Sequence, residues 1–171
     1  MKPIAGLGAA TLVCAVFAAG STSAADGLFS TEPDVERSIV LPVAADAAWE
    51  SLGLFCSLED WQSLVASCVV EERADGFVRI VVMTDNTVFV ERLEQFSNED
   101  RVFAYSILSG PLPVENYRAR FSVDEEDGGS RIAIEAWYDV PPEIDGEETA
   151  AALARLFDNG LAGMSDMVGP R

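Results

Sequence analysis

The sequence GFVRIVVMTDNTVFVERLEQFSNEDRVFAYSILSGPLPVENY, residues 76–117, contains three apolar segments that are rich in β-branched residues. They are Val78–Met83, Thr87–Leu93 and Val102–Leu108. Only short polar turns separate them, and strands this close in sequence pair as an antiparallel meander. The stretch therefore predicts the centre of an antiparallel sheet.

Two charged residues, Arg79 and Glu91, lie inside these apolar segments, where charge is unusual. If Asp85 is the centre of a three-residue turn, residues 79 and 91 face each other on one side of the sheet. One interpretation is an ion pair on a solvated face. The other is a polar pair that faces a cavity, with the apolar neighbours Val81, Met83, Phe89 and Leu93 as its lining.

The first 24 residues have the pattern of a secretory signal peptide, with Lys2, an apolar run to Gly20 and small residues before the expected cleavage point. We expect cleavage near Ala24, a polar leader over residues 25–33 and one domain over residues 34–168. Val13 is too bulky for a lipid attachment site at Cys14. The mature protein is therefore expected outside the cytoplasm, in the periplasm or secreted.

The chain has a formal net charge of −18, which becomes −19 when Lys2 is removed. Such an acidic surface repels phosphate backbones and anionic lipids, so we expect no nucleic-acid partner and no stable membrane insertion. The sequence has no histidine, which excludes histidine-based metal sites and Ser-His or Cys-His catalysis. It indicates no metal, no cofactor and no recognisable catalytic group, and it leaves the oligomeric state undefined.

Two cysteines remain after the signal peptide, Cys56 and Cys68. An oxidising compartment would permit a disulfide between them. The residues between them resemble a helix followed by the start of a strand, which would carry the two Cα atoms beyond the ~7 Å limit for bridging. Two buried thiols are the favoured interpretation, and the disulfide remains the alternative.

Four further strands and three helices are predicted around the meander. Ser57 is the expected N-cap of the second helix, and an acidic turn over residues 124–129 is expected to join the last two strands. The strands are Val35–Val43, Val65–Arg73, Asn116–Val123 and Arg131–Val140, and the helices are residues 44–52, residues 58–64 and Gly146–Val168. The order β-αα-β6-α predicts an α+β fold in which a seven-stranded antiparallel sheet curves around the long C-terminal helix.

The long helix has apolar positions at three- and four-residue spacing, as an amphipathic helix requires. Gly160 and Gly163 interrupt it and cost about 1 kcal/mol each relative to alanine. Close packing against the sheet is one explanation of these glycines. Room for a ligand beside the helix is the other, because one helix cannot fill a strongly curved sheet.

Several short motifs together resemble the SRPBCC superfamily, which is also called START-like or birch-pollen-allergen-like. The motifs are Trp61, Ser67-Cys68, Gly76-Phe77-Val78-Arg79, Val90-Glu91-Arg92-Leu93, Tyr105-Ser106-Ile107 and residues 109–117. Their order is most similar to that of the polyketide cyclase/dehydrase and lipid-transport group. The resemblance implies a helix-grip fold with a ligand cavity between the sheet and the C-terminal helix.

The chain also resembles the plant abscisic acid receptors, in which positions matching Glu91, Tyr105, Ile107 and Tyr117 line the hormone cavity. Gln62 stands where those receptors have a lysine, and a short turn replaces their gate loop, so binding of that hormone is not implied. The loop 109–114 is expected to act as a lid. The predicted ligand-binding residues are Arg79, Val81, Met83, Phe89, Glu91, Tyr105, Ile107, Leu112, Tyr117, Ala119, Ile134, Tyr138, Leu153, Phe157 and Gly160.

Three functions fit these features. The first is an exported domain that binds a small hydrophobic or amphipathic molecule, which requires only an apolar cavity with a few polar groups. The second is an enzyme of the cyclase, aromatase or dehydratase type, in which Glu91 or a tyrosine such as Tyr138 would have to transfer protons. A glutamate paired with an arginine is a poor general base, which disfavours this hypothesis. The third is a structural or interaction domain with a filled core.

Overall fold

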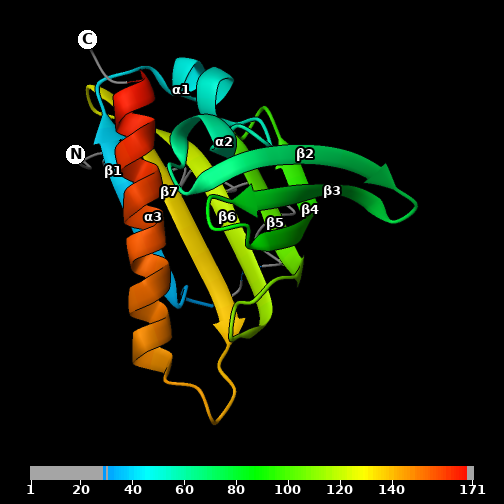
Figure 1. The fold of residues 1–171 in the computed structure, drawn as a ribbon. Helices are drawn as coiled ribbons and strands as arrows, with labels where there is room; N and C mark the ends of the chain where they lie inside the picture. The colour runs from blue at the N-terminus through cyan, green and yellow to red at the C-terminus, as the bar shows by residue number, and fades with distance from the viewer. Residues whose placement is uncertain (1–28, 30, 169–171) are drawn as a thin grey trace, which may run out of the picture.

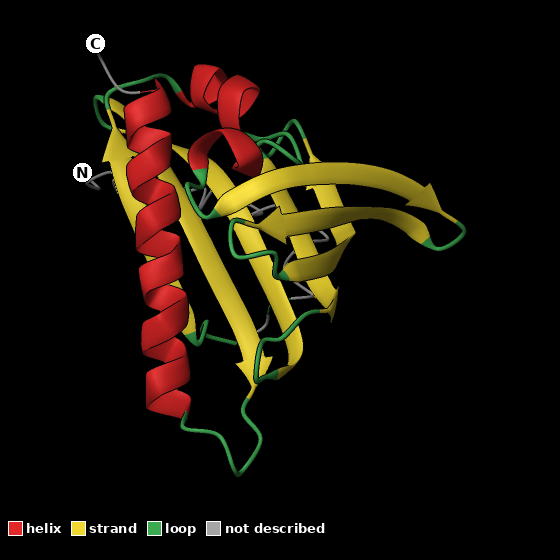
Figure 2. Ribbon diagram, in the orientation of Figure 1, coloured by secondary structure: helices red, strands yellow, loops and turns green. Residues whose placement is uncertain are grey.

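The structure is a computed structural model that describes residue 29 and residues 31–168. Seven strands form one antiparallel sheet in the order β1-β7-β6-β5-β4-β3-β2. Two short helices lie at one end of the sheet, and the long helix α3 crosses its concave face (Figures 1 and 2). The elements are β1 Val35–Leu41, α1 Ala45–Leu52, α2 Leu58–Trp61, β2 Val65–Arg73, β3 Gly76–Met83, β4 Val88–Ser97, β5 Val102–Ser109, β6 Glu115–Glu126, β7 Gly129–Asp139 and α3 Gly146–Val168.

The predicted fold class and strand count are confirmed, as is the register of the central meander. Arg79 pairs with Glu91 between β3 and β4, because the turn after Met83 joins the two strands without a shift. In that turn Asn86 adopts a positive φ of 68°, and the Asp85 carboxylate accepts a hydrogen bond of 2.8 Å from the Thr87 N–H. The turn thus sets which side chains of β3 and β4 share a face.

Several predicted boundaries are wrong. β1 ends at Leu41 rather than at residue 43, and β4 runs on to Ser97 because a bulge near Leu93 lets its last residues continue pairing with β5. The acidic segment 124–126 pairs with residues 129–131 as strand, so the turn between β6 and β7 contains only Asp127 and Gly128. The positive φ of Gly128, 85°, permits this tight connection.

The second helix is a single turn that ends at Trp61, not at residue 64. Gln62 leaves the helix in an extended conformation, and its side-chain amide donates to the Leu156 carbonyl of α3 at 3.1 Å. Ser57 makes no side-chain cap. Its hydroxyl instead donates to the Leu52 carbonyl and accepts from the Trp61 indole N–H. Contacts with neighbouring elements therefore override the local helix signal.

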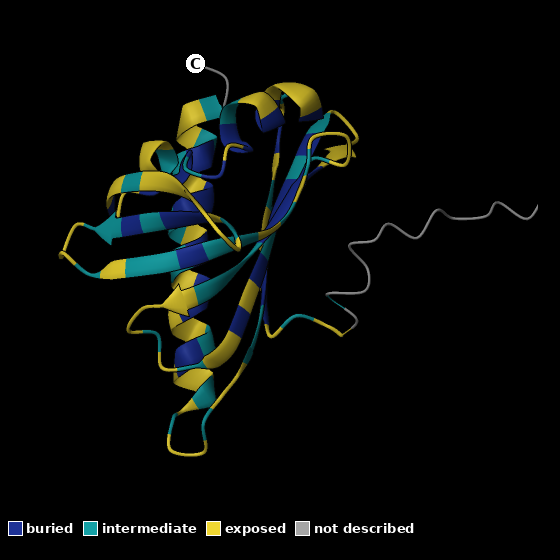
Figure 3. Ribbon diagram, turned by 90° about the vertical axis from the view of Figure 1, so that its right-hand side faces the viewer, coloured by how far each residue is buried: buried dark blue, intermediate teal, exposed yellow. Residues whose placement is uncertain are grey.

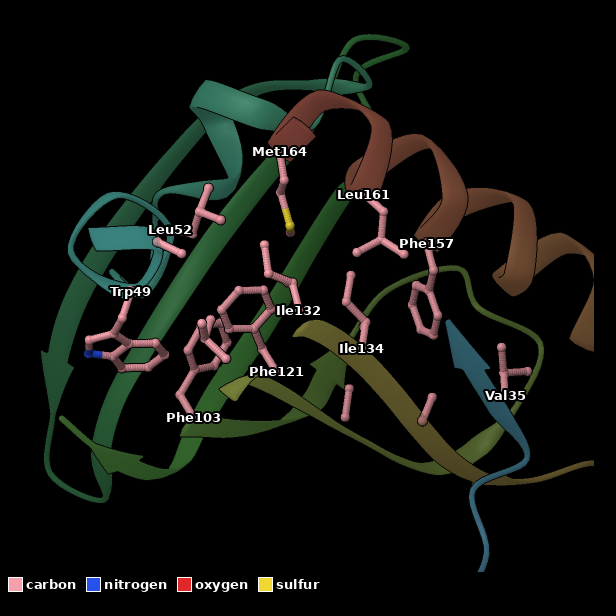
Figure 4. Close-up of a cluster of buried hydrophobic side chains, with 14 of the residues drawn as sticks. Val35, Trp49, Leu52, Phe103, Phe121, Ile132, Ile134, Phe157, Leu161 and Met164 are labelled. Atoms are coloured by element: carbon pink, nitrogen blue, oxygen red, sulfur yellow. The ribbon is translucent and has the colours of Figure 1, made fainter. Parts of the chain in front are cut away.

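The main core lies between the concave face of the sheet, α1 and α3. Figure 4 shows Phe103, Phe121 and Ile132 on the sheet facing Met164 and Leu161 on α3. Trp49 on α1 closes one end, with its ring centroid 6.2 Å from that of Phe121. Buried residues follow the inner faces of the sheet and of α3, whereas the far end of the β2–β3 hairpin is mostly exposed (Figure 3).

Gly160 and Gly163, the two glycines in the interior of α3, are explained by close packing, but against α2 rather than against the sheet. A Cβ at Gly163 would overlap the Trp61 carbonyl oxygen. A Cβ at Gly160 would lie 3.0 Å from the Trp61 ring and 3.1 Å from the Gln62 amide nitrogen. The absence of side chains at these positions lets α2 approach α3.

Gly163→Ala is therefore expected to destabilise the domain by about 1–3 kcal/mol, since the added methyl group must displace backbone. Gly146→Ala is the matched control. It lies at the start of the same helix, where a Cβ would make ordinary contacts of 3.7 Å with Val140. Chemical denaturation of both variants measures the difference, and equal stabilities would contradict the close contact between α2 and α3.

Candidate functional site

A second, smaller cluster of apolar residues lies beside the main core and contains Leu58, Val65 and Val81. Between the two clusters is a cavity of about 100 Å³. It is bounded by the sheet from β3 to β7, by the loop after β5, by α2 with the start of β2, and by the N-terminal half of α3. The lining residues are Leu58, Trp61, Gln62, Val65, Arg79, Val81, Met83, Phe89, Glu91, Phe103, Tyr105, Ile107, Leu112, Tyr117, Phe121, Ile134, Leu153, Leu156 and Phe157.

The alternation of side chains along the strands brings this lining together. The odd-numbered residues 79, 81 and 83 of β3 face inward, and so do residues 91 and 89 of β4, the partners of 79 and 81. On β5, Tyr105 and Ile107 continue the same face. Phe157 reaches the cavity from the opposite side, from α3 (Figure 4).

Arg79 and Glu91 form a buried ion pair at the cavity, so the interpretation of a solvated surface pair is wrong. Arg79 is 3% exposed and Glu91 is 8% exposed. Arg79 Nε donates to Glu91 Oε2 at 2.5 Å, and Arg79 Nη1 donates to the Phe55 carbonyl oxygen. The Arg79 charge is removed from water but keeps hydrogen-bond partners, as a buried ion requires.

Aromatic rings cover the Arg79 guanidinium group. Its central carbon lies 4.4 Å from the centroid of the Phe55 ring and 4.5 Å from that of the Tyr105 ring. The negative faces of aromatic rings attract a cation, so these contacts add to the attraction of Glu91. The guanidinium group is thereby held in one orientation between the α1–α2 loop, β4 and β5.

Two buried tyrosines lie next to this pair. Burial, together with the negative charge of Glu91, raises the pKa of Tyr105 to about 12. Burial also raises the pKa of Tyr117 well above 10.0, with Tyr105 and Glu91 as further causes. Both hydroxyl groups therefore remain protonated at neutral pH, where they can form hydrogen bonds but do not release protons.

We expect Tyr105 to titrate in the folded protein near pH 12 and in the unfolded protein near 10.0. Between these pH values the folded state binds more protons than the unfolded state, so the stability of the folded state falls as the pH rises. Below this window Tyr105 makes no contribution to the pH dependence of stability. Tyrosinate absorbance of native and urea-unfolded protein measures both titrations. Tyr105→Phe should lower by one the number of tyrosines that titrate late in the native protein, with Tyr117 still titrating late, and identical native and unfolded titrations would contradict the burial.

Gln62 contributes an unusual polar atom to the site. The residue is 7% exposed, and its Oε1 atom has no hydrogen-bond partner among the described residues. The amide cannot be turned over, because the Leu156 carbonyl only accepts and must face the amide nitrogen. A buried carbonyl oxygen without a donor is costly, and it is therefore a candidate for interaction with a ligand.

Cys56 and Cys68 form a disulfide with a Cα–Cα distance of 5.6 Å, so the favoured interpretation of two free thiols is wrong. The two Cα atoms are closer than predicted because α2 is only one turn long and β2 folds back beside it. The Cys68 N–H donates to the Glu59 carboxylate at 2.8 Å, which holds β2 against α2. The disulfide anchors the loop that supplies the Phe55 carbonyl to Arg79.

The structure places twelve of the fifteen predicted ligand-binding residues at the cavity and leaves out Ala119, Tyr138 and Gly160. Ala119 faces inward but is fully buried and too short to reach the cavity. Tyr138 stacks behind the Tyr117 ring at 6.3 Å, and Gly160 packs against α2. Leu93, also expected in the lining, packs against the main core instead. Ligand binding by the twelve remains a prediction.

Sequence reasoning missed seven lining residues. Phe103 and Phe121 share the inward parity of β5 and β6, which could have identified them. Leu156 neighbours the predicted Phe157 on α3. The four others lie on or next to α2, whose position depends on tertiary contacts: Leu58, Trp61, Gln62 and Val65.

The loop between β5 and β6 lies at the edge of the cavity. Leu112 contributes to the lining, and Gly110 packs so closely on Phe89 that a Cβ would overlap the phenyl ring. The loop therefore touches the site at two points. Its role as a lid remains a prediction.

The site has an apolar lining with one ion pair, two tyrosines and one glutamine. Within residues 29 and 31–168, no group of three or more Cys, Asp or Glu side chains is placed to hold a metal ion. No helix in these described ranges is both long and apolar enough to cross a bilayer. The arrangement can bind an apolar molecule and form hydrogen bonds with one polar group on it.

A curved antiparallel sheet that grips one long helix over an internal cavity defines the helix-grip, or START-like, class of protein. The chain belongs to the polyketide cyclase/dehydrase and lipid transport family, whose model matches residues 32–168, and thus to the SRPBCC superfamily. No curated protein matches the sequence. The narrower resemblance to abscisic acid receptors remains a prediction.

Solved structures with the same fold include two from Bacillus. The protein XoxI from Bacillus cereus is 27% identical, with a TM-score of 0.71 over 78% of this chain and 93% of that one. A Bacillus thuringiensis protein is also 27% identical, with a TM-score of 0.70 over 78% and 96% of the two chains. Ara h 8.0201, at 14% identity and a TM-score of 0.62 over 78% and 95%, shares the fold.

Proposed function

We propose that this domain binds a small, mostly apolar molecule in the cavity between β3–β5 and α3. The buried Arg79–Glu91 pair is the observation that carries the proposal. Moving two charges out of water is costly, and well-packed apolar residues of similar size often serve stability as well or better. A charged pair retained at the wall of an apolar cavity is therefore explained by recognition of a polar group.

The size of the cavity limits the ligand. Its volume of about 100 Å³ is below the roughly 300–1,000 Å³ of most ligand pockets. A dry engineered cavity of about 150 Å³ binds benzene. The site in this conformation therefore suits a single small ring or the end of a longer molecule. A larger ligand would require the loop 109–114 to move away from Phe89.

The two other functions receive less support from the site. An enzyme of the cyclase or dehydratase type needs a group that exchanges protons near neutral pH. Tyr105 and Tyr117 have raised pKa values, and Glu91 is paired with Arg79. A purely structural domain would be expected to fill its interior at close-packed density. The presence of a cavity next to the buried polar groups favours a binding function over an enzymatic or a purely structural one.

The proposed location of the protein is outside the cytoplasm. Residues 1–24, on which the signal-peptide prediction rests, lie outside the described residues. The disulfide between Cys56 and Cys68 supports this location, since such bonds persist in oxidising compartments. Cell fractionation with N-terminal sequencing tests it: we expect extracytoplasmic protein that begins near Ala25, and cytoplasmic protein beginning at Met1 would contradict it.

Binding can be tested by titration with p-cresol, a single ring with one hydroxyl group, followed by two-dimensional amide NMR. We expect saturable shifts concentrated at β3, β4 and the loop 109–114. Ile107→Phe should fill the cavity and abolish these shifts. Leu108→Phe is the matched control, because this neighbouring side chain is 44% exposed on the outer face and should leave binding intact. Equal binding by both variants would contradict a cavity site.

A further inference from the structure

We infer that the cavity selects neutral molecules with a hydrogen-bond donor, such as phenols and alcohols, and rejects carboxylates. This inference rests on the proposed function and adds the chemical class of the ligand. The inference is based on the polar atoms of the site. Some of them already have a hydrogen-bond partner within the protein, and others do not.

The first free acceptor is on Glu91. Its Oε2 atom accepts from Arg79, whereas no described residue donates to its Oε1 atom. The side chain lines the cavity and keeps 10% of its surface accessible. A ligand that donates a hydrogen bond can use this oxygen without breaking the ion pair.

The second free acceptor is Oε1 of Gln62, a lining residue between α2 and β2. The Leu156 carbonyl fixes the orientation of the amide group, so this oxygen has no donor within the described residues. A buried acceptor without a donor gains a full hydrogen bond when a suitable ligand arrives. Two acceptors on different elements thus favour a ligand that donates.

The single basic side chain in the lining, Arg79, is already paired with a carboxylate, Glu91. Glu91 and the Phe55 carbonyl accept from two of its nitrogens, and the Phe55 and Tyr105 rings lie close to its central carbon. A bound carboxylate would have to compete with Glu91 for this one cation and would lie beside the negative charge of Glu91. In a desolvated site, the repulsion between two like charges is stronger than in water.

A hydroxyl group also suits the tyrosines. The Tyr105 and Tyr117 hydroxyls interact with each other and remain protonated at neutral pH. A ligand hydroxyl can donate to Glu91 or Gln62 and also accept from a tyrosine. An ether of the same shape can only accept, and a carboxylate can only accept while adding charge.

Three probes of similar size separate these cases by calorimetric titration at neutral pH: p-cresol, 4-methylanisole and 4-methylbenzoate. We expect p-cresol to bind roughly tenfold more tightly than 4-methylanisole, which corresponds to one hydrogen bond of about 1.4 kcal/mol. We expect no saturable binding of 4-methylbenzoate. Gln62→Met should reduce the preference for p-cresol over 4-methylanisole, while Ser63→Ala, a change at an exposed neighbour, should not.

The outcomes distinguish this inference from the proposed function. Equal affinities for p-cresol and 4-methylanisole, or tighter binding of 4-methylbenzoate, would overturn the inference and leave a ligand-binding cavity. Failure of all three probes to bind would overturn the proposed function and the inference together. If Gln62→Met does not fold, the comparison of the three probes on the unaltered protein still decides the question.

Discussion

Replacing Glu91 by alanine is expected to lower the free energy of unfolding by about 3–5 kcal/mol, because Arg79 would remain buried without its counter-charge. Arg79→Ala should cost a similar amount, since Glu91 would then be the unpaired ion. The double replacement Arg79→Met with Glu91→Leu should recover much of the loss, because apolar side chains of similar size can fill the same space.

Urea denaturation of the single and double variants measures the coupling between the two residues. The ion pair between Arg73 and Glu71 is the matched control, since it joins the same residue types at 2.9 Å with both side chains more than 40% exposed. Arg73→Ala should change stability by only about 0–1 kcal/mol. Losses equally small at Arg79 and Glu91 would contradict the burial of the pair.

Removing the disulfide is expected to have the next largest effect. Replacing Cys56 and Cys68 by alanine opens a loop with a sequence separation of 12, and the unfolded chain then gains conformational entropy. The expected loss is about 3 kcal/mol. Denaturation of the variant in parallel with the reduced unaltered protein measures it, and both should show the same loss.

The consequence should also reach the cavity. Cys56 follows Phe55, whose carbonyl accepts from Arg79 and whose ring lies 4.4 Å from the guanidinium carbon. Loss of the disulfide should therefore weaken binding of p-cresol along with stability. Unchanged stability in the double cysteine variant would show that the bond does not restrain the chain.

The fold could be predicted because its determinants are local. Strand alternation, short turns and one amphipathic helix are all visible in the sequence. The turn at Asp85 fixed the register of Arg79 against Glu91, and that register implied a shared face. The burial of the Arg79–Glu91 pair could not be predicted from the sequence, because an ion pair on one face of a sheet can face either solvent or a cavity.

The site was only partly predictable because some of its walls depend on tertiary packing. Inward parity and the family resemblance identified most of the β3, β4 and β5 lining. The contribution of α2 could not be predicted, because its approach depends on the fit of Trp61 against Gly160 and Gly163. The glycines indicated a close approach without naming its partner. The disulfide was missed for the same reason, because its geometry depends on how far α2 extends.

The family alone does not determine function, because one fold can hold many different sites. In this chain the discriminating features are the paired arginine, the unpartnered Gln62 oxygen and the small volume of the cavity. They are properties of particular side chains. They lead to a more specific ligand class than the description of the family provides.

Intermolecular nuclear Overhauser effects between p-cresol and the protein test the account most directly. We predict contacts from the ring and methyl protons of p-cresol to Val81, Ile107 and Phe157, and none to Leu108 on the outer face. These contacts should disappear in Ile107→Phe. Contacts only with exposed residues, such as Val69 or Phe77 on the β2–β3 hairpin, would contradict a binding cavity between the sheet and α3.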